Sequence, residues 1–392
     1  MFKNTKIAFK YKSDWQLKKS KLIFKFISNL FFSKFLIPTI GFLVRKKIPI
    51  ITFLVKKTVF EQFCGGENKK ECIKVIEKIH SYGVYSVLDY SVEGKSNEED
   101  FDKIYKETLE NIYFAEKKKS IPFIVFKPTG IGNVKIYEKI SNKNDLNEEE
   151  QNSWEKIKNR FEGLCKKSCE KKVFVLIDAE ESWIQPAIDD LAEKMMKKYN
   201  KEKCYIYNTL QMYRWGRLEY LKKSHIKSLK ENYFIGYKIV RGAYMEKERE
   251  RSIINNYIDP IQNNKEYTDK DFNDAISYII NNINKKISIF IGTHNEKSCE
   301  LAVNIIKKNN IDNNNKNIWF GQLYGMSDNI SFILSKNGYN VAKYLPYGPI
   351  QETVPYLIRR SEENSSISGQ TNREYSLITK EINRRNKYNK NK

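Results

Sequence analysis

The segment from Tyr344 to Asn364 contains the residues with the most distinctive chemistry. It passes from an apolar run through a Pro/Gly turn into a stretch with helical periodicity. There Tyr356, Arg359, Arg360 and Glu363 are spaced by three, four and seven residues from the first, which places them on one helix face. Two adjacent guanidiniums beside an aromatic ring are suited to binding a small carboxylate. A solvated amphipathic helix is the alternative interpretation.

Short apolar runs that could position this helix recur along the chain, and each is followed by a helical pattern. Near-continuous apolar strands that alternate with helices are typical of a parallel sheet covered on both faces. Eight such units predict an α/β fold, a (β/α)8 TIM-like barrel, preceded by an N-terminal helical region. A doubly wound sheet is the alternative, but no GxGxxG follows the first strand. The expected strands are 84–90, 122–128, 173–178, 204–209, 235–241, 287–293, 318–323 and 340–346. The expected helices include 100–118, 154–170, 182–199, 272–285, 296–309 and 350–364.

Polar residues occur in or just after the carboxyl-terminal half of almost every expected strand. This is the end of a barrel at which such enzymes build their sites. A structural core does not explain polar residues at so many strand ends. They are Lys127, Asp178, Asn208, Lys238 with Arg241, Thr293–Asn295, Gln322 with Leu323, and Tyr344.

The formal net charge of +22 is concentrated near the two ends of the chain. Residues 1–60 contain fourteen Lys or Arg and one acidic residue, Asp14, and basic clusters alternate there with apolar runs. Each run is shorter than the ~20 residues of a membrane-spanning helix. This pattern favours a peripheral membrane surface, and no nucleic-acid-binding motif accompanies it. A mitochondrial transit peptide, or helices that only pack on the main domain, remain open alternatives.

The cysteines and histidines do not form a metal-binding pattern. The six cysteines include no CxxC pair, and Cys165 with Cys169 lack two further ligands, so we expect reduced structural thiols and no metal. We expect His80 and His225 on the surface. The expected divisions of the chain are a basic helical region at 1–80, the barrel at 81–365 and a basic tail at 366–392.

Several of these segments together resemble the FAD-dependent proline dehydrogenase family in its monofunctional form. The resemblance extends from about residue 50 to 365, and its motifs are long and specific. The matching segments are LDYSVEG (88–94), DAEESWIQPAIDDLA (178–192), YKIVRGAYMEKER (237–249), GTHN (292–295), FGQLYGM (320–326) and YLPYGPIQETVPYLIRRSEEN (344–364).

The resemblance implies a substrate site for proline. Arg359 and Arg360 would bind its carboxylate with help from Lys127, and Asp178 would lie near the amine. Asp178 could instead, or also, cap a helix at 180–192. The residues that would shape the pocket around the ring are Leu323, Tyr344 and Tyr356. Glu93 resembles the residue that pairs with one of the arginines as a gate.

The resemblance also implies an FAD site. Lys238 would lie near flavin N5, where a cation stabilises the reduced ring, so Lys127, Asp178 and Lys238 are the expected catalytic residues. Asn208 stands where some relatives have Gln, and Gln211 and Gln322 are further candidates. The other expected cofactor contacts are Val240, Arg241, Gly242, Ala243, Tyr244, Thr293, His294, Asn295 and Glu363.

The activity implied is oxidation of L-proline to 1-pyrroline-5-carboxylate by hydride transfer to FAD, with electrons passed to a membrane quinone. The expected location is cytoplasmic and peripheral on the inner membrane in a bacterium, or at the mitochondrial inner membrane in a eukaryote. One alternative is a hydroxyproline dehydrogenase of the same family. Another is a basic nucleic-acid- or lipid-binding protein on an inactive barrel.

Overall fold

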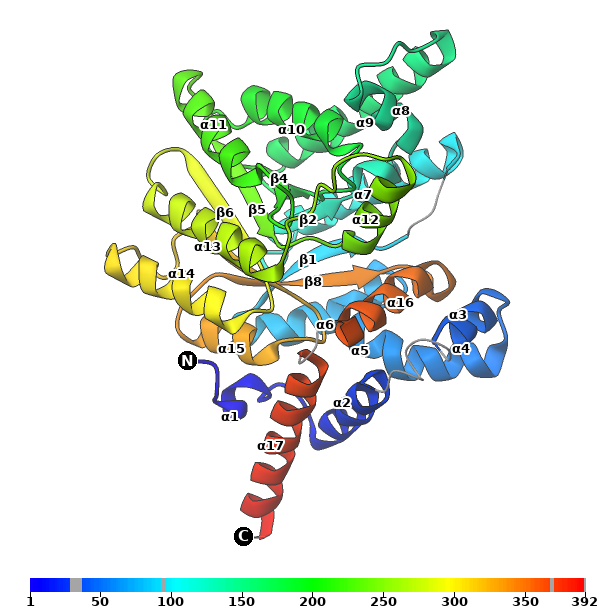
Figure 1. Cartoon of the computed structure of the whole chain (residues 1–392). Helices are drawn as coiled ribbons and strands as arrows, with labels where there is room; N and C mark the ends of the chain where they lie inside the picture. Colours follow the sequence, from blue (N-terminus) through cyan, green and yellow to red (C-terminus); the bar gives the residue numbers. More distant parts are fainter. Residues whose placement is uncertain (29–36, 93–95, 367–369, 391–392) are drawn as a thin grey trace. The chain divides into compact units, whose positions relative to one another are not determined.

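A computed structural model describes residues 1–28, 37–92, 96–366 and 370–390, with side chains except at 37, 38, 359–366, 370 and 390. Among these residues, strands β1 to β8 form one closed barrel in sequence order (Figure 1). Its paired neighbours run parallel, as β1 with β8 and β5 with β6 show. The strands are β1 (Tyr85–Tyr90), β2 (Phe123–Phe126), β3 (Phe174–Ile177), β4 (Ile206–Gln211), β5 (Ile235–Val240), β6 (Ile287–Gly292), β7 (Ile318–Leu323) and β8 (Val341–Tyr347).

The predicted barrel is confirmed, since each expected apolar run overlaps one of these strands and the sheet closes on itself. Closure also rules out the doubly wound alternative. Most strand residues are buried, including every residue of β2, β3, β4 and β8. Strands covered on both faces need apolar side chains on both, which explains why they read as continuous apolar runs rather than as alternating ones.

The barrel helices lie between the strands in the order that the sequence predicts. Within the part of the chain that the structure describes, they are α7 (Glu98–Glu116), η3 (Pro128–Gly130), α8 (Val134–Ser141), α9 (Glu148–Glu170), α10 (Gln185–Tyr199), α11 (Arg217–Lys230), α12 (Met245–Ile254), α13 (Lys265–Asn281), α14 (Glu296–Lys308), α15 (Asp328–Lys336) and α16 (Ile350–Ser366). Asparagine caps begin several of them. Asn97 and Asn147, for example, accept hydrogen bonds from backbone N–H groups in the first turns of α7 and α9.

Aromatic packing shows which side chains face the inside of the barrel. The ring of Phe123 on β2 lies 4.8 Å from Phe174, 5.7 Å from Tyr207, 5.2 Å from Phe290 and 5.0 Å from Trp319, measured between centroids. These rings come from β2, β3, β4, β6 and β7, so they can meet only in the barrel interior. Because successive side chains on a strand point to opposite faces, every second residue from each ring also faces inward.

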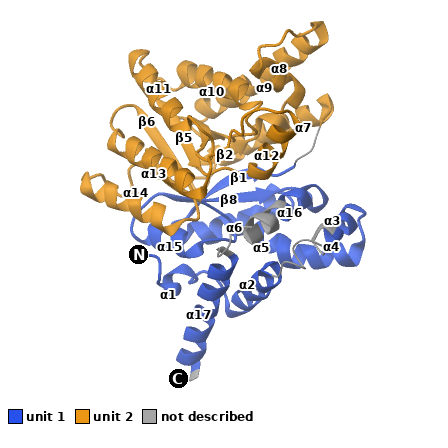
Figure 2. Cartoon of the chain, viewed as in Figure 1, with its two compact units in different colours: residues 1–93, 322–392 blue, residues 94–321 orange. Residues whose placement is uncertain are grey.

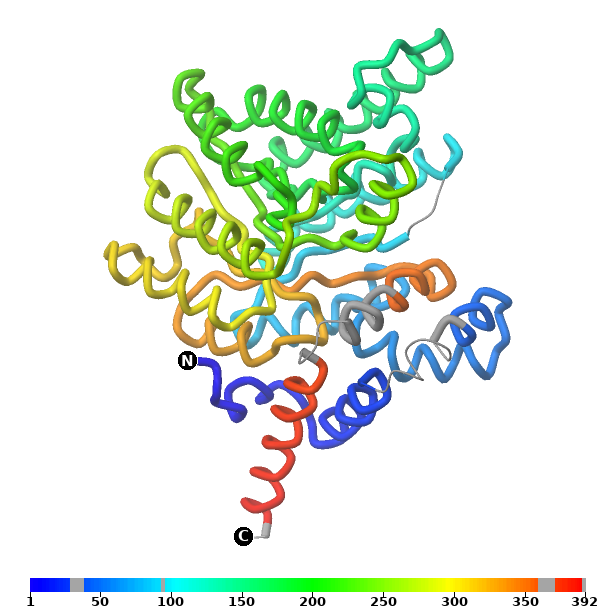
Figure 3. The backbone as a smooth tube through the Cα atoms, in the orientation of Figure 1, coloured from blue at the N-terminus to red at the C-terminus, as the bar shows by residue number. Residues whose placement is uncertain are grey.

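The chain divides into two compact units, residues 1–93 with 322–392 and residues 94–321 (Figure 2). The first unit also contains α1 (Thr5–Ala8), α2 (Asp14–Ile27), α3 (Ile37–Arg45), α4 (Pro49–Val55), η2 (Lys56–Phe60), α5 (Glu61–Phe63), α6 (Lys69–His80) and α17 (Gln370–Lys390). It joins the two ends of the sequence, because α17 packs on α2 and β1 pairs with β8 (Figure 3). The division at residues 80 and 365 stays a prediction.

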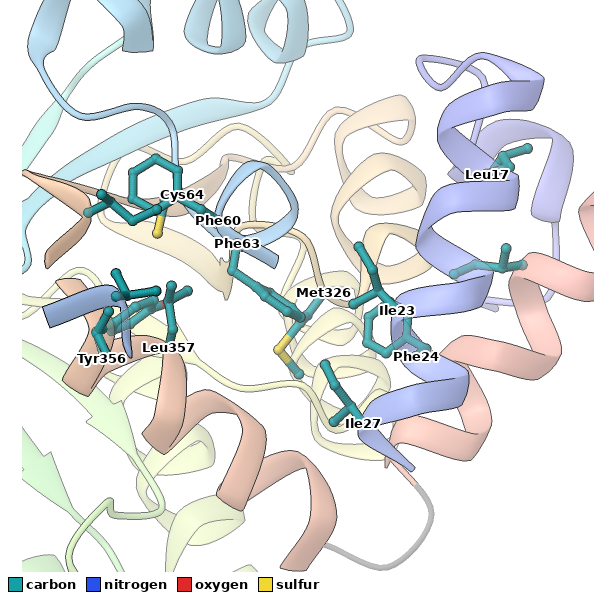
Figure 4. Packing of buried hydrophobic residues seen from close by; sticks show 14 of the residues in the cluster. Leu17, Ile23, Phe24, Ile27, Phe60, Phe63, Cys64, Met326, Tyr356 and Leu357 are labelled. Atoms are coloured by element: carbon teal, nitrogen blue, oxygen red, sulfur yellow. The ribbon is translucent and has the colours of Figure 1, made fainter. Parts of the chain in front are cut away.

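A hydrophobic core joins the N-terminal helices to α16 within the first unit. Phe24 of α2 meets Phe63 of α5 edge to face, with 6.1 Å between ring centroids. Met326 and Tyr356 belong to the same buried cluster, which Figure 4 shows from close by. The N-terminal helices therefore contribute apolar side chains to a core that also contains the helix of the paired arginines.

Asp328 is the centre of a buried ionic cluster in this unit. Lys12 lies 3.1 Å from its carboxylate and Lys343 of β8 lies 3.0 Å from it, and the Tyr11 hydroxyl donates to it at 2.8 Å. The side chains of Asp328 and Lys343 are 2% and 1% exposed. Although burial raises the pKa of Asp328, the two lysines lower it overall. The cluster fixes the N-terminal segment to β8 and α15.

His225 differs from the sequence-based expectation of a surface residue. It is 1% exposed, and its ring nitrogens lie 3.0 Å from the Tyr278 hydroxyl and 2.7 Å from the Lys285 carbonyl oxygen. Burial lowers its pKa. The helix α11 looks amphipathic in sequence, but α13 packs on it and covers this position. No helix of the described residues is long and apolar enough to cross a membrane.

Candidate active site

Four side chains of the unit at 94–321 share the inward alternation and lie near the carboxyl ends of their strands. Lys127 lies just after β2, four residues from the inward-facing Phe123. Asp178 lies just after β3, four residues from the inward-facing Phe174. Even spacing places both on the inward side. Gln211 ends β4, and Lys238 lies on β5 beside Thr209. This arrangement places polar groups at the carboxyl end of this part of the barrel, which is the end at which barrel enzymes build their sites.

Lys238 and Asp178 form an ion pair across the barrel interior. Their side chains are 7% and 18% exposed. A charged pair this well buried keeps both groups in fixed positions, because each would lose its counter-charge on moving away. Asp178 is not a helix cap, since α10 begins at Gln185 after an N-cap at Ile184. The capping alternative for Asp178 was therefore wrong.

Glu180 is a buried carboxylate that the sequence analysis missed. It is 3% exposed and accepts hydrogen bonds from the Thr129 hydroxyl at 2.7 Å, the Thr129 backbone N–H at 3.2 Å and the Tyr244 hydroxyl at 3.3 Å. Burial raises its pKa to about 7, against the opposing effect of the Lys127 cation. Glu180 thus holds two rim loops together with a carboxyl group that titrates near neutral pH.

Gln211 links the loops that follow β3 and β5. Its amide donates to the Glu180 backbone carbonyl at 2.8 Å, and its side-chain oxygen accepts from the Ala243 backbone N–H at 3.0 Å. Gly242 next to it has a φ of +143°, and a Cβ there would collide with the Tyr213 ring. The chain therefore needs glycine at this position, and both Gly242 and Ala243 are exposed residues.

Arg241 ties the end of β5 to the start of α14. Its guanidinium donates to Asp269 at 2.6 Å, to the Thr293 hydroxyl at 2.8 Å and to the Ser298 hydroxyl at 3.0 Å. Asn295 caps α14 by accepting from the Ser298 backbone N–H at 3.1 Å. The predicted residues Thr293 and Asn295 thus sit at a helix N-terminus, a position that favours anionic groups.

The structure corrects two predicted cofactor contacts, Asn208 and Gln322. Asn208 is fully buried, and its amide donates to Asp189 of α10 at 2.8 Å. Gln322 is 2% exposed, and its side-chain oxygen accepts from the Ser331 hydroxyl of α15 at 2.8 Å. Both alternate with inward-facing residues, so their side chains contact the outer helices rather than the barrel interior.

The other predicted residues of the first unit are partly described. Tyr344 on β8 is 8% exposed, and Tyr356 on α16 is 4% exposed within the hydrophobic core. Leu323 packs against the same core. The predicted contacts of Arg359, Arg360 and Glu363, whose backbones belong to α16, lie outside the described side chains, and Glu93 lies outside the described residues.

Glu248 is a further residue that holds the rim, and the sequence analysis gave it no role. Its carboxylate accepts from the Ser182 backbone N–H at 2.6 Å and from the Ser182 hydroxyl at 2.5 Å. The only sequence signal for Glu248 was its place in the motif YKIVRGAYMEKER. Glu180 likewise lies in the motif that begins DAEESW.

A closed parallel barrel with a buried Lys–Asp pair and a titrating carboxyl at its strand ends defines a barrel enzyme.

Comparisons with known proteins identify the family. The model of the proline dehydrogenase family matches residues 72–373. A Pectobacterium carotovorum subsp. carotovorum protein named carbapenem antibiotics biosynthesis protein CarD is 36% identical over 82% of this chain and 83% of its own. Proline dehydrogenase 1, mitochondrial, from Dictyostelium discoideum is 35% identical over 86% of this chain and 66% of its own. The chain therefore belongs to the proline dehydrogenase family.

Two further comparisons concern another relative and the fold. Hydroxyproline dehydrogenase from Xenopus laevis is 27% identical over 96% of this chain and 89% of its own. The crystal structure of proline utilization A (PutA) from Bdellovibrio bacteriovorus matches with a TM-score of 0.74 and 19% identity, which shows a shared fold. The match covers 93% of this chain and 40% of the PutA chain, so the present chain spans less than half of that protein.

Proposed function

We propose that this protein oxidises L-proline to 1-pyrroline-5-carboxylate with FAD as its cofactor. The observation that carries the proposal is the buried Lys238–Asp178 pair at the strand ends, within a chain that belongs to the proline dehydrogenase family. Removing a hydride from the ring carbon leaves a positive charge shared with the ring nitrogen. A carboxylate fixed near that nitrogen would stabilise this charge as it develops.

The chain's own residues offer partners for each polar group of proline. Arg359 and Arg360, adjacent on α16, would bind the carboxylate, and Lys127 would add a third positive charge. Asp178 uses Oδ1 to hold Lys238, so its Oδ2 can accept a hydrogen bond from the substrate amine. Tyr344, Tyr356 and Leu323 would form the apolar wall around the ring. Fixing the carboxylate and amine together would orient the ring carbon that reacts.

The residues present fit a flavin. Lys238 supplies a buried cation, the exposed residues Gly242 and Ala243 allow close approach, and the start of α14 suits a phosphate. When bound, FAD accepts the hydride and carries the two electrons onward. Lys238 would lie near its ring system. The remaining proposed contacts are Val240, Arg241, Tyr244, Thr293, His294, Asn295 and Glu363.

The electrons would then pass to a membrane quinone, so the protein would work at a membrane surface. In a bacterium this would be the cytoplasmic face of the inner membrane, and in a eukaryote the mitochondrial inner membrane. The basic residues at 1–60 support this location, because anionic lipids attract such segments.

A flavin absorbance titration of the purified protein tests the proposed function. We expect yellow protein whose flavin band bleaches on addition of proline in the absence of an acceptor. Arg360→Met should raise the apparent KM for proline by at least ~30-fold, since losing one partner of a buried charge pair costs roughly 2–5 kcal/mol. Lys307→Met, an exposed lysine on α14, is the control. An unchanged KM in Arg360→Met would contradict the carboxylate assignment.

The same titration separates the alternatives. The similarity to the Xenopus enzyme over almost the whole chain favours hydroxyproline as the second candidate substrate. Faster bleaching with 4-hydroxyproline than with proline would establish that alternative. Colourless protein that binds RNA with a steep salt dependence would instead support a binding protein on an inactive barrel.

A further inference from the structure

The helical hairpin of α3 and α4 exposes an unusual amount of apolar surface. The exposed fractions are 58% for Phe42, 73% for Ile50, 60% for Phe53 and 52% for Leu54, and Ile48 in the turn is 38% exposed. We call these five residues the hairpin face. They fall within thirteen consecutive residues, so they form a local group rather than scattered single side chains.

The hairpin is already anchored by a different set of side chains. Val44 is fully buried, and a Cβ at Gly41 would lie 2.8 Å from Ile358 and 2.9 Å from Val354 of α16, so the two helices touch closely there. Ile51 and Val55 of α4 are partly buried against the same core. These residues pack the hairpin on the core, and the residues of the hairpin face are not needed for that packing.

The charged residues within the hairpin sequence, from Ile37 to Val55, are all positive. Arg45 ends α3 and Lys46 and Lys47 form the turn to α4, and all three are exposed. The Lys46 ammonium lies 5.7 Å from the centroid of the Phe42 ring, so charge and apolar surface adjoin. No acidic residue occurs between positions 15 and 60. Exposed apolar side chains beside lysines, without acids, match the lipid–water boundary of an anionic membrane.

A second exposed apolar group shows the contrast. Ile253 and Ile254 in the last turn of α12 are 79% and 72% exposed, and Ile258 after the helix is 90% exposed. Their neighbours in sequence include the acids Glu250 and Asp259 as well as Arg249 and Arg251, so the charge there is mixed. This second group therefore lacks the uniformly positive charge of the hairpin sequence.

We propose that the hairpin face is the membrane-docking element of this protein, inserting its apolar side chains into an anionic lipid surface while the turn lysines contact the headgroups. The biological reason for docking rests on the proposed function. The binding of lipid does not, because it needs no catalytic turnover. The proposal specifies a part of the basic N-terminal region that meets the membrane, namely residues 42–54.

Sedimentation with lipid vesicles tests the proposal on the full-length protein. Vesicles of phosphatidylglycerol and phosphatidylcholine in equal amounts are compared with vesicles of phosphatidylcholine alone. We expect binding to the first that is weakened by salt. The double variant Ile50→Asp/Phe53→Asp should lower the partition coefficient by at least ~10-fold, because its side chains no longer enter the lipid. The double variant Lys46→Glu/Lys47→Glu should lower it by at least ~25-fold.

Matched variants and a separate activity assay make the outcome decisive. Ile258→Asp and Lys307→Glu/Lys308→Glu alter equally exposed residues elsewhere and should bind as the unmodified protein does. Proline-dependent reduction of a soluble dye reports the proposed function and should be the same in all variants. Equal binding by the hairpin variants and the unmodified protein would overturn the proposal. So would a change from dimer to monomer in the hairpin variants, since a second copy would then cover this face.

Discussion

Glu180→Gln should make the stability of the protein less sensitive to pH. The pKa of Glu180 is about 7 in the folded protein against a usual value of 4.5. One pKa unit corresponds to 1.36 kcal/mol, so the difference amounts to about 3 kcal/mol. The side chain is 3% exposed, so solvent screening reduces this figure little. The groups that face this carboxyl are Lys127, Thr129, Glu181, Tyr137 and Tyr244.

The sign follows from which state holds the proton more tightly. The folded state keeps the Glu180 proton up to about pH 7, whereas the unfolded chain releases it near pH 4.5. The favourable contribution to folding is therefore complete below the unfolded pKa and is lost as pH rises through the folded pKa. Glutamine has no such proton, and its oxygen can still accept the hydrogen bond from the Thr129 hydroxyl.

Urea unfolding of both proteins at about pH 5 and about pH 8 measures this effect. Relative to the unmodified protein, Glu180→Gln should gain roughly 2–3 kcal/mol in free energy of unfolding between the two pH values. The exposed Glu149→Gln on α9 is the control and should show no such gain. The difference in free energy of unfolding between Glu180→Gln and the unmodified protein could instead be the same at both pH values. That result would mean that burial does not hold the proton on Glu180.

Two further predictions concern packing and charge. Asp328→Ala should lower the free energy of unfolding by roughly 3–5 kcal/mol, because it leaves buried lysines without their counter-charge. Asp14→Ala removes one partner of an exposed ion pair and should lower it by less than about 1 kcal/mol. Gly242→Ala should lower the free energy of unfolding by roughly 1–3 kcal/mol, because the added Cβ collides with the Tyr213 ring. Gly216→Ala places a Cβ in open space and should lower it by about 1 kcal/mol or less. Urea denaturation measures all four variants. Equal costs within either pair would contradict these explanations.

Much of the fold could be predicted because its signals are local. Each strand of the barrel is a short apolar run and each helix has a 3.6-residue period, so the alternation of the two is visible in the sequence. The motifs around Asp178 and Lys238 were assigned through the family resemblance, and the ion pair between these two residues is seen only in the structure. Local patterns thus predicted the architecture but not this buried pair.

Strand ends were less predictable, and this misplaced Asn208. The sequence predicted a strand at 204–209, which put Asn208 near its end, but β4 runs from Ile206 to Gln211. A shift of two residues makes Gln211 the residue at the strand end and places Asn208 in the middle, on the side of α10. Register against β5 and packing against α10 set those limits, and neither is visible in a single segment.

The sequence by itself determined the order of strands and helices, the basic acid-free N-terminal region and the family motifs, because each depends on residues close together along the chain. Only the tertiary structure decided that Glu180 titrates near neutral pH, that α13 buries His225, and that Lys12, Asp328 and Lys343 share one cluster. Burial and electrostatic partners are contributed by residues far apart in sequence. Their effects on a given side chain exist only once the chain has folded around it.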